Sequence, residues 1–249
     1  MNHLEVRGLV KRFGGLLATD HVDLDLARGE LHAVIGPNGA GKTTLINQLS
    51  GEIIPDEGRI VFDGQDLTRE PPHRRAMAGL GRSFQITSVF NDFTVLQNAA
   101  LAVQAHAGHS FRFWRPAAVE AALTQPAMAA LEQVGLTARA HTPVAALAHG
   151  ERRQLEIAMV LATGAKCLLL DEPMAGMSPA ESEAVVALLR RLKGEHTILL
   201  VEHDMDAVFA LADRLTVLVY GRPIATGTPE QIRNQPEVRE AYLGEAEHL

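Results

Sequence analysis

The stretch Gly36-Pro37-Asn38-Gly39-Ala40-Gly41-Lys42-Thr43-Thr44 decides the fold of this 249-residue chain. Gly36, four intervening residues and then Gly41, Lys42 and Thr43 give the spacing of a phosphate-binding loop. Glycine backbones can turn N–H groups toward a β-phosphate, Lys42 can reach the β- and γ-phosphates, and Thr43 can offer a hydroxyl to Mg²⁺. The alternative is an ordinary glycine-rich turn. We predict that the nine residues bind a nucleotide.

The flanking segments predict the strand and helix that such a loop requires. Leu31–Ile35 is apolar with little alternation, which indicates a buried strand running into the loop, and Thr43–Leu49 suits the following helix. Three further segments predict strands: Leu4–Leu9, the alternating Val22–Leu26, and Gly58–Asp66 ending in the Asp63-Gly64 turn.

The second half of the chain predicts parallel strands and a hairpin. Cys167–Leu170 and Thr197–Val201 are short apolar runs separated by a helical stretch, Pro179–Leu192, which together indicate a βαβ unit. Leu215–Tyr220 and Pro223–Thr226 around Gly221 predict a closing hairpin. Between the halves, Thr94–Ala146 has helical spacing with an interruption near Gly108–Pro116, which predicts a separate helical lobe.

Two carboxylates follow the strand Cys167–Leu170. Asp171 and Glu172 lie where the carboxyl end of a parallel strand is expected, the edge at which such sheets bind ligands. Neighbouring strand residues point in opposite directions, so we expect Asp171 to hold Mg²⁺ through water while Glu172 faces the γ-phosphate and orients an attacking water. An acidic strand end that only meets solvent is the alternative.

With these features in order, the chain resembles ABC-type ATPases over nearly its whole length. Gln85 resembles the family's Q-loop glutamine, which contacts Mg²⁺ or the water and links the core to the helical lobe. His203 resembles the switch histidine, and Phe13 stands where the family stacks an aromatic ring on adenine. Taken singly, a loop glutamine, a surface histidine and a core phenylalanine are commoner interpretations. The signature motif corresponds to Leu147, Ala148, His149, Gly150 and Glu151, before the helical stretch Arg152–Leu161.

The resemblance implies an α/β P-loop NTPase of the ABC ATPase fold, with an antiparallel β subdomain and an inserted α-helical subdomain. It implies one nucleotide-binding domain, with residues 1–85 and 147–249 forming the core, β subdomain and tail, and 86–146 the helical subdomain. The cofactors are then ATP and Mg²⁺. ATP would lie between the phosphate loop of one subunit and the signature of a second ABC ATPase subunit, identical or different. The catalytic set is Lys42, Gln85, Glu172 and His203, and the metal set is Thr43, Gln85 and Asp171.

Two motifs depart from the family pattern. The commonest signature is Leu-Ser-Gly-Gly-Gln, whereas this chain has Ala148, His149 and Glu151 at its second, third and fifth positions. Without the serine hydroxyl, contact with the other subunit's γ-phosphate rests on Gly150, backbone N–H groups and the helix dipole. The segment Ala175–Ser178 resembles the family's D-loop and ends in serine, where many relatives have aspartate. We still expect hydrolysis, and a degenerate regulatory cassette is the alternative.

Several phrases resemble one branch, the ATPase subunits of branched-chain amino acid importers and especially the longer of the two. That resemblance implies transmembrane permease subunits as partners, a substrate-binding protein outside the membrane as an indirect partner, and a peripheral location on the cytoplasmic face of the inner membrane. ATPases for urea or short amides, or for lipopolysaccharide export, are alternatives. The phrases are Arg12–Ala18, Val201–Met205, Gly227–Arg233 and Ala241–Glu245.

Composition excludes several other classes. The formal net charge is −7 with no cluster of Lys and Arg, which argues against nucleic acid as a partner. The sequence has no long coiled coil, which a soluble DNA- or ribosome-associated ABC ATPase would need. It also has no Asn-Lys-x-Asp tetrad, which a GTPase would need. No apolar run approaches a bilayer span, and the first residues lack a signal peptide's pattern, so we expect a cytoplasmic protein. Cys167 reads as a core residue. Residues 106–116 combine aromatic and arginine residues, either as a permease- or membrane-facing patch or as a loop packed under the helical lobe.

Overall fold

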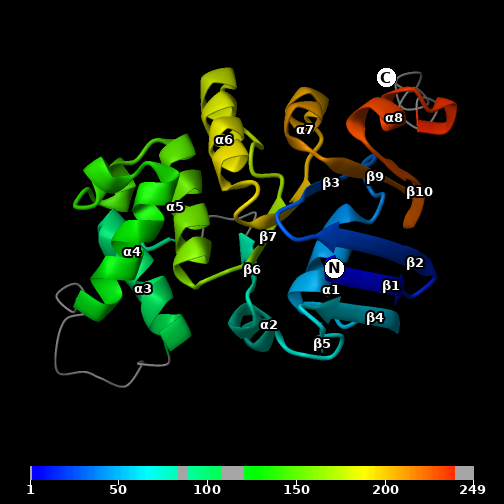
Figure 1. The fold of residues 1–249 in the computed structure, drawn as a ribbon, viewed down its shortest axis with the longest axis horizontal. Helices are drawn as coiled ribbons and strands as arrows, with labels where there is room; N and C mark the ends of the chain where they lie inside the picture. The colour runs from blue at the N-terminus through cyan, green and yellow to red at the C-terminus, as the bar shows by residue number, and fades with distance from the viewer. Residues whose placement is uncertain (1, 84–88, 108–120, 239–249) are drawn as a thin grey trace.

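Two β-sheets and a group of helices make up the computed structural model, which describes residues 2–83, 89–107 and 121–238 (Figure 1). The elements in chain order are β1 (Asn2–Phe13), β2 (Leu16–Ala27), β3 (Leu31–Ile35), α1 (Lys42–Ser50), β4 (Glu57–Phe62), β5 (Gln65–Asp66), α2 (Pro72–Ala78), β6 (Leu80–Ser83), α3 (Val95–Ala107), α4 (Ala121–Val134), η2 (Thr137–Arg139), η3 (Val144–Ala146), α5 (His149–Ala162), β7 (Cys167–Asp171), α6 (Pro179–Leu192), β8 (Thr197–Val201), α7 (Met205–Leu211), β9 (Arg214–Val219), β10 (Arg222–Gly227) and α8 (Pro229–Arg233).

The central sheet has six strands in the order β10-β9-β3-β8-β7-β6. All neighbours are parallel except β10, which pairs antiparallel with β9. Every residue of β3, β7 and β8 is buried, because helices cover one face and the second sheet with α1 covers the other. The predicted βαβ unit is confirmed, with α6 spanning the predicted Pro179–Leu192.

Alternate residues of the central strands enter two separate apolar clusters. In β7, Leu168 and Leu170 pack with the helices, while Cys167 and Leu169 pack toward the second sheet. This two-sided burial explains why these strands read as continuous apolar runs instead of alternating ones. The prediction of a core cysteine is confirmed, since Cys167 is fully buried and burial raises the pKa of its thiol to about 12.

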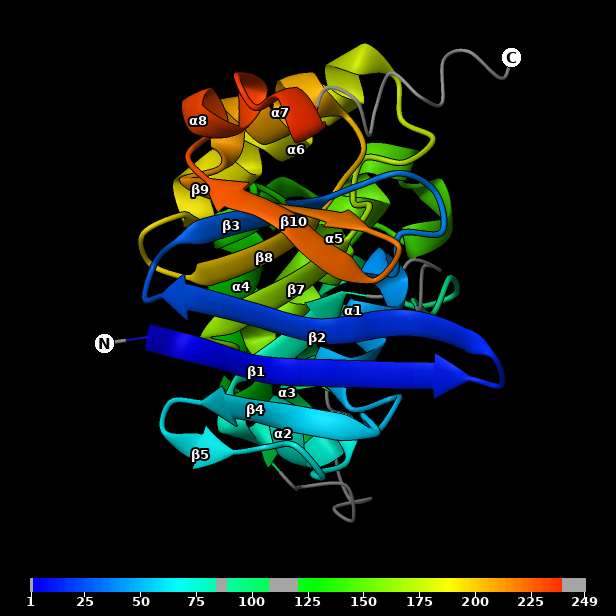
Figure 2. The ribbon, with the colours of Figure 1, turned by 90° about the vertical axis from the view of Figure 1, so that its right-hand side faces the viewer.

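The second sheet has the order β2-β1-β4-β5 and is antiparallel (Figure 2). The predicted turn at Asp63-Gly64 is confirmed, but the single strand predicted over Gly58–Asp66 is corrected to two strands. The strand β4 ends at Phe62, and Asp63 and Gly64 have φ of 50° and 79°, which form a two-residue turn into the short strand β5. The predicted hairpin around Gly221 is confirmed and has the same form, with Tyr220 and Gly221 both at positive φ.

Helix α1 packs between the two sheets, against β2, β6 and β7. Arg75 of α2 holds the far end of this helix. Although fully buried, its guanidinium donates to the carbonyl oxygens of Gln48 and Leu49 at 2.6 and 2.8 Å, and burial lowers its pKa to about 10. The start of α1 is thereby left at the carboxyl edge of β3.

Helices α3, α4 and α5 pack on one another beside the β6 edge of the central sheet, and we call these three the helical lobe (Figure 1). The subdomain boundaries stated above stay a prediction. Of the aromatic and arginine segment 106–116, residues 108–116 lie outside the described residues. Within the described ranges, no helix is both long enough and apolar enough to span a bilayer.

Candidate functional site

The predicted phosphate-binding loop connects β3 to α1 and depends on glycine at two close approaches. Gly36 has φ of 155°, and a Cβ there would lie 2.1 Å from the Leu218 carbonyl oxygen. Gly41 has φ of 100°, and its Cβ would lie 2.1 Å from the Ala18 carbonyl oxygen. The backbones of β9 and β2 therefore lie so close to the loop that neither position has room for a side chain. Gly39 differs, because its Cβ would meet nothing within 4 Å and only its φ of 77° favours glycine.

Lys42 is the first residue of α1, and its side chain turns back across the loop. The Nζ atom donates to the carbonyl oxygens of Gly36 at 2.6 Å and Pro37 at 2.9 Å. The residue is buried, which is rare for lysine unless it has partners. Its ammonium group is thus held at the mouth of the loop. Asn38 and Gly39 are exposed and Ala40 is buried, while Thr43 is exposed and Thr44 half-buried.

The N-terminus of α1 is left open to a ligand. Its N-cap is Gly41, which provides no side-chain acceptor, and its first turn contains no acidic residue. By contrast, α6, α7 and α8 are capped by the side chains of Ser178, Asp204 and Thr228. Uncapped N–H groups and the positive end of the helix dipole favour an anion at this position.

Asp171 is the last residue of β7 and lies deep at the carboxyl edge of the sheet. Its side chain is 1% exposed, and Oδ2 lies 3.4 Å from Nη2 of Arg82. Burial raises the pKa of the carboxyl group, while the positive charges of Arg82 and Lys42 oppose that shift and the nearby Glu172 adds to it. Its Oδ1 is buried without a hydrogen-bond partner in the described structure.

Glu172 and His203 meet at the same edge. Glu172 follows β7 with φ of 46°, and its side chain is 24% exposed. The prediction that it alternates with Asp171 as a strand residue is corrected, because the strand ends at Asp171. The left-handed backbone of Glu172 itself sets the direction of its carboxylate. His203 Nδ1 lies 3.9 Å from Glu172 Oε1, which is an ion-pair distance only when the imidazole is protonated.

Glu202 supports this pair, although the sequence interpretation missed it. Its buried carboxylate accepts N–H bonds from Met174 at 2.9 Å and from His203 at 3.1 Å. Burial raises its pKa, and the two N–H bonds oppose that shift. The group joins the segment after β7 to the segment after β8. A glutamate beside the histidine was visible, but its burial was not.

Arg153 of α5 is a second residue that the sequence interpretation missed. It donates from Nε to the Pro173 carbonyl oxygen at 3.0 Å and from Nη2 to that of Glu172 at 3.3 Å. Its Nη1 pairs with Glu156 at 2.7 Å. The guanidinium therefore connects the helix of the predicted signature to the backbone that carries Glu172.

The predicted signature forms the start of α5, which begins at His149, three residues earlier than expected. Ala148 is the N-cap and has no side chain to accept the N–H groups of the first turn, while Glu151 Oε2 accepts the N–H of Ala148 itself at 3.0 Å. Leu147 is buried. The Gly150 N–H, expected to face a phosphate, donates to Glu181 Oε1 of α6 at 3.1 Å.

Of the two remaining predicted site residues, only Phe13 is among the described residues. Phe13 ends β1, pairs with Leu16 and is 48% exposed, and the Lys11 ammonium lies 5.7 Å from the centre of its ring. Gln85 lies outside the described residues. The strand β6 before it ends at Ser83, which pairs with Leu170 beside Asp171.

The residues present fit a magnesium ion. Mg²⁺ in nucleotide sites is held by one or two protein oxygens together with phosphate oxygens and water. Asp171 Oδ1 is a buried carboxylate oxygen without a hydrogen bond, and Thr43 leaves a hydroxyl exposed at the start of α1. A hard cation bound through these oxygens would satisfy the carboxylate that burial leaves under-compensated.

Comparisons with known proteins agree with this geometry. The family model described as ABC transporter matches residues 19–175, and that described as Branched-chain amino acid ATP-binding cassette transporter matches residues 222–248. The chain is 43% identical over 98% of both sequences to the high-affinity branched-chain amino acid transport ATP-binding protein BraF of Pseudomonas aeruginosa. It is also 43% identical, with the same coverage, to LivG of Escherichia coli K12, which carries the same description.

Solved structures resemble the fold over nearly the whole chain. A nucleotide-free ATP-binding cassette from an ABC transporter matches with a TM-score of 0.84 at 31% identity, covering 97% of this chain and 99% of that one. A cassette in its ADP conformation matches with a TM-score of 0.86 at 32% identity, covering 98% and 99%. The chain therefore belongs to the ABC transporter family, as one of its ATP-binding cassettes.

Proposed function

We propose that this cassette hydrolyses ATP with Mg²⁺ at a site shared with a second cassette, and thereby powers a membrane importer for branched-chain amino acids. The observation that carries the proposal is the convergence of four side chains at one edge of the central sheet. Lys42 starts α1, which packs on β7. Asp171 ends β7 and Glu172 follows it, and His203 Nδ1 lies 3.9 Å from Glu172 Oε1. Phosphoryl transfer needs this combination of positive charge, a metal ligand and a group that orients water.

Each residue then has a separate task. The loop N–H groups, the α1 dipole and Lys42 bind the β- and γ-phosphates. Thr43 and Asp171, with Gln85 by resemblance, would hold Mg²⁺, which supplies charge neutralisation at the phosphates. Glu172 accepts a proton from the attacking water or orients it, and His203 stabilises charge on the γ-phosphate. Phe13 offers an exposed ring on which adenine can stack.

The place of the signature supports a shared site. Leu147–Glu151 belongs to the start of α5, which packs on α3, α4, α6 and β6, whereas the phosphate loop starts α1, which packs on β2, β6 and β7. We infer that a second cassette, identical or different, contributes its signature to the ATP bound here. Closure of the pair on ATP and reopening after hydrolysis would do work on a permease.

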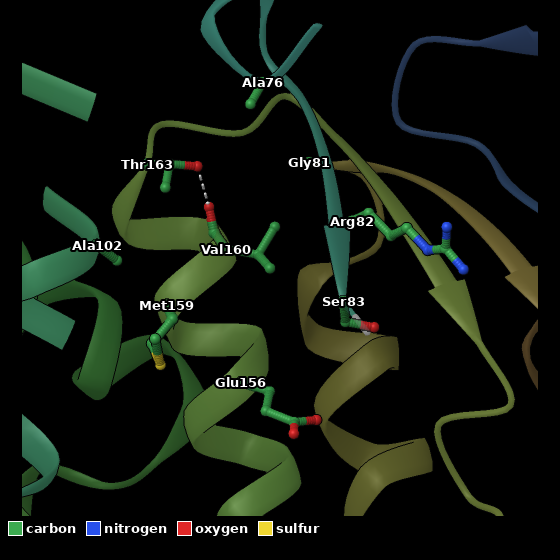
Figure 3. A pocket seen from close by; sticks show the side chains of 9 residues that line it. All are labelled: Ala76, Gly81, Arg82, Ser83, Ala102, Glu156, Met159, Val160 and Thr163. Carbon is green, nitrogen blue, oxygen red and sulfur yellow. Dashed lines mark hydrogen bonds between the residues drawn. The ribbon is translucent and has the colours of Figure 1, made fainter. Parts of the chain in front are cut away.

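An apolar cavity supports a permease contact (Figure 3). It measures about 220 Å³ and lies between α2, β6, α3 and α5. Ser83 ends β6 and borders it, while the Arg82 guanidinium extends to the other side of β6 and bonds Asn47 Oδ1 at 2.6 Å. A permease segment seated there would touch both the helical lobe and the strand that leads toward Gln85. Its other lining residues are Ala76, Gly81, Ala102, Glu156, Met159, Val160 and Thr163.

The substrate class comes from the relatives. Two that cover 98% of the chain are described as branched-chain amino acid transport proteins, and the tail model has the same description. Import of these amino acids, a substrate-binding protein outside the membrane and a peripheral location on its cytoplasmic face are the matching expectations. Urea or short-amide import and lipopolysaccharide export find no comparable support among these relatives.

Replacing Glu172 by Gln tests the proposal. The amide keeps the size of the side chain but cannot accept a proton, so we expect ATP binding to persist, turnover to fall by about 10²- to 10⁴-fold, and an ATP-dependent dimer to accumulate. Turnover by phosphate release and mass by analytical ultracentrifugation measure the two effects. Wild-type turnover in Glu172→Gln would refute the assignment.

A further inference from the structure

Glu181 connects the D-loop segment to the predicted signature, which the proposed mechanism places at the interface between cassettes. It lies in the first turn of α6, and Oε2 accepts the N–H of Ser178 at 3.0 Å and its hydroxyl at 2.7 Å. The other oxygen, Oε1, accepts the Gly150 N–H at 3.1 Å across a sequence separation of 31 residues. One carboxylate thus joins the D-loop serine to the predicted signature.

The contact meets a helix start that lacks a capping side chain. With alanine as N-cap, α5 has no N-cap side chain that could accept the N–H groups of its first turn. Glu151 satisfies the Ala148 N–H, and Glu181 satisfies that of Gly150 from a different helix. Glycine suits the position, since a Cβ on Gly150 would lie only 3.2 Å from Glu181 Cγ. Glu181 therefore replaces part of a missing cap.

The Gly150 N–H is also among the groups on which contact with a partner's γ-phosphate is expected to rest, together with other backbone N–H groups and the helix dipole. Hydrogen bonds from Ser178 lower the pKa of Glu181, so its carboxylate is ionised near neutral pH. A phosphate approaching Gly150 meets a donor already engaged by an anion and a like charge beside it. The carboxylate and the γ-phosphate cannot both occupy one N–H at full strength.

We propose that Glu181 is a positioning residue that holds the signature amide until the γ-phosphate of ATP on the other cassette displaces it. The inference rests on the shared site proposed above. In the separated cassette, Glu181 orders the start of α5 and opposes closure on ATP. On closure, the hydrogen bond from the Gly150 N–H to Oε1 breaks while the bonds from Ser178 to Oε2 remain. Phosphate binding at the signature thereby changes a contact of the D-loop segment.

The test compares Glu181→Gln with Glu183→Gln, both in the Glu172→Gln protein so that hydrolysis does not interfere. Glu183 is the matched control, because it is an exposed glutamate two residues along the same helix. Glutamine at position 181 keeps one oxygen acceptor but loses the charge. We expect its ATP-dependent dimer dissociation constant to fall about five- to tenfold, the difference between charged and neutral hydrogen bonds, while the control stays within about twofold of the parent.

Two further measurements separate displacement from simple helix capping. The tightening should shrink as salt increases, because a charge causes it. Glu181→Asp keeps a carboxylate for Ser178 but is one methylene too short for Gly150, so we expect it to tighten the dimer less than glutamine does. Melting temperatures should fall slightly or stay unchanged in Glu181→Gln and Glu181→Asp. A gain in stability would therefore not account for the gain in dimer affinity.

The outcomes distinguish this inference from the proposed function. If the Glu172→Gln parent forms no ATP-dependent dimer, the shared site itself fails. If the parent dimerises but Glu181→Gln has the same dissociation constant as Glu183→Gln, or a weaker one, Glu181 does not compete with phosphate and the inference is overturned.

Discussion

At the scale of single residues, the backbone of one glutamate decides the geometry of the site. Glu172 adopts φ of 46° directly after a strand, a conformation that costs a non-glycine residue of order 1–3 kcal/mol and persists only where its surroundings enforce it. Arg153 provides part of that enforcement through the carbonyl oxygens of Glu172 and Pro173. The strained residue and its restraint belong to one functional unit.

Replacing Arg153 by Met should therefore reduce catalysis without reducing ATP binding. We expect kcat to fall about 10- to 100-fold, the usual cost of misplacing a catalytic group by about 1 Å, while the dissociation constant for ATP stays unchanged. Stability should fall by about 3 kcal/mol because the variant leaves Glu156 buried without this ion-pair partner. Steady-state kinetics, nucleotide titration and urea unfolding measure the three effects.

Arg152→Met is the control for that variant. Arg152 precedes Arg153 on the same helix but donates to the Ala145 carbonyl oxygen, away from Glu172. Its kcat should match the wild type. Wild-type kcat in Arg153→Met would show that the link between α5 and Glu172 has no catalytic role.

Motifs allowed Lys42, Asp171, Glu172 and His203 to be proposed for the candidate site from the sequence, and their roles stay a prediction. Their supports could not be predicted, because they act across long separations. Arg153 meets Glu172 from 19 residues away, and Glu202 meets Met174 from 28. A buried arginine and a surface arginine look alike in a sequence until the packing around them is known.

At the scale of elements, nearly continuous apolar runs made β3, β7 and β8 predictable, since burial on both faces leaves only one polar residue in each, namely His32, Asp171 and Thr197. The short elements were harder. The strand β5 has two residues and exists only through pairing with β4, and the start of α5 moved to His149 because Ala148, a residue with no capping signal, is its N-cap.

The loop between β3 and α1 provides a matched pair of glycine substitutions. Gly36→Ala should abolish ATP binding and destabilise the protein, because its Cβ would overlap the Leu218 carbonyl oxygen. Gly39→Ala meets only a positive φ and should cost about 1 kcal/mol with the loop intact. Urea unfolding and nucleotide titration report both. Equal losses in the two variants would contradict the close approach at Gly36.

At the scale of the whole molecule, two sheets enclose α1 while the helical lobe carries the signature away from it (Figures 1 and 2). Hydrophobic patterning predicted buried strands, a βαβ unit and a separate helical lobe, and family resemblance supplied the antiparallel β subdomain. How two cassettes meet is a property of no single chain. The central claim is that one cassette binds ATP and a second cassette completes the ATP site. This claim must be tested on pairs of cassettes.

Complementation between two inactive variants is that test. Lys42→Ala disables the phosphate loop and Gly150→Asp disables the signature, so each homodimer should lack ATPase activity. A mixed dimer combines the intact loop of one chain with the intact signature of the other. Because half of the dimers in an equal mixture are mixed and each has one intact site of two, phosphate release should recover to roughly a quarter of the wild-type rate. A mixture as inactive as its two components would contradict the shared site.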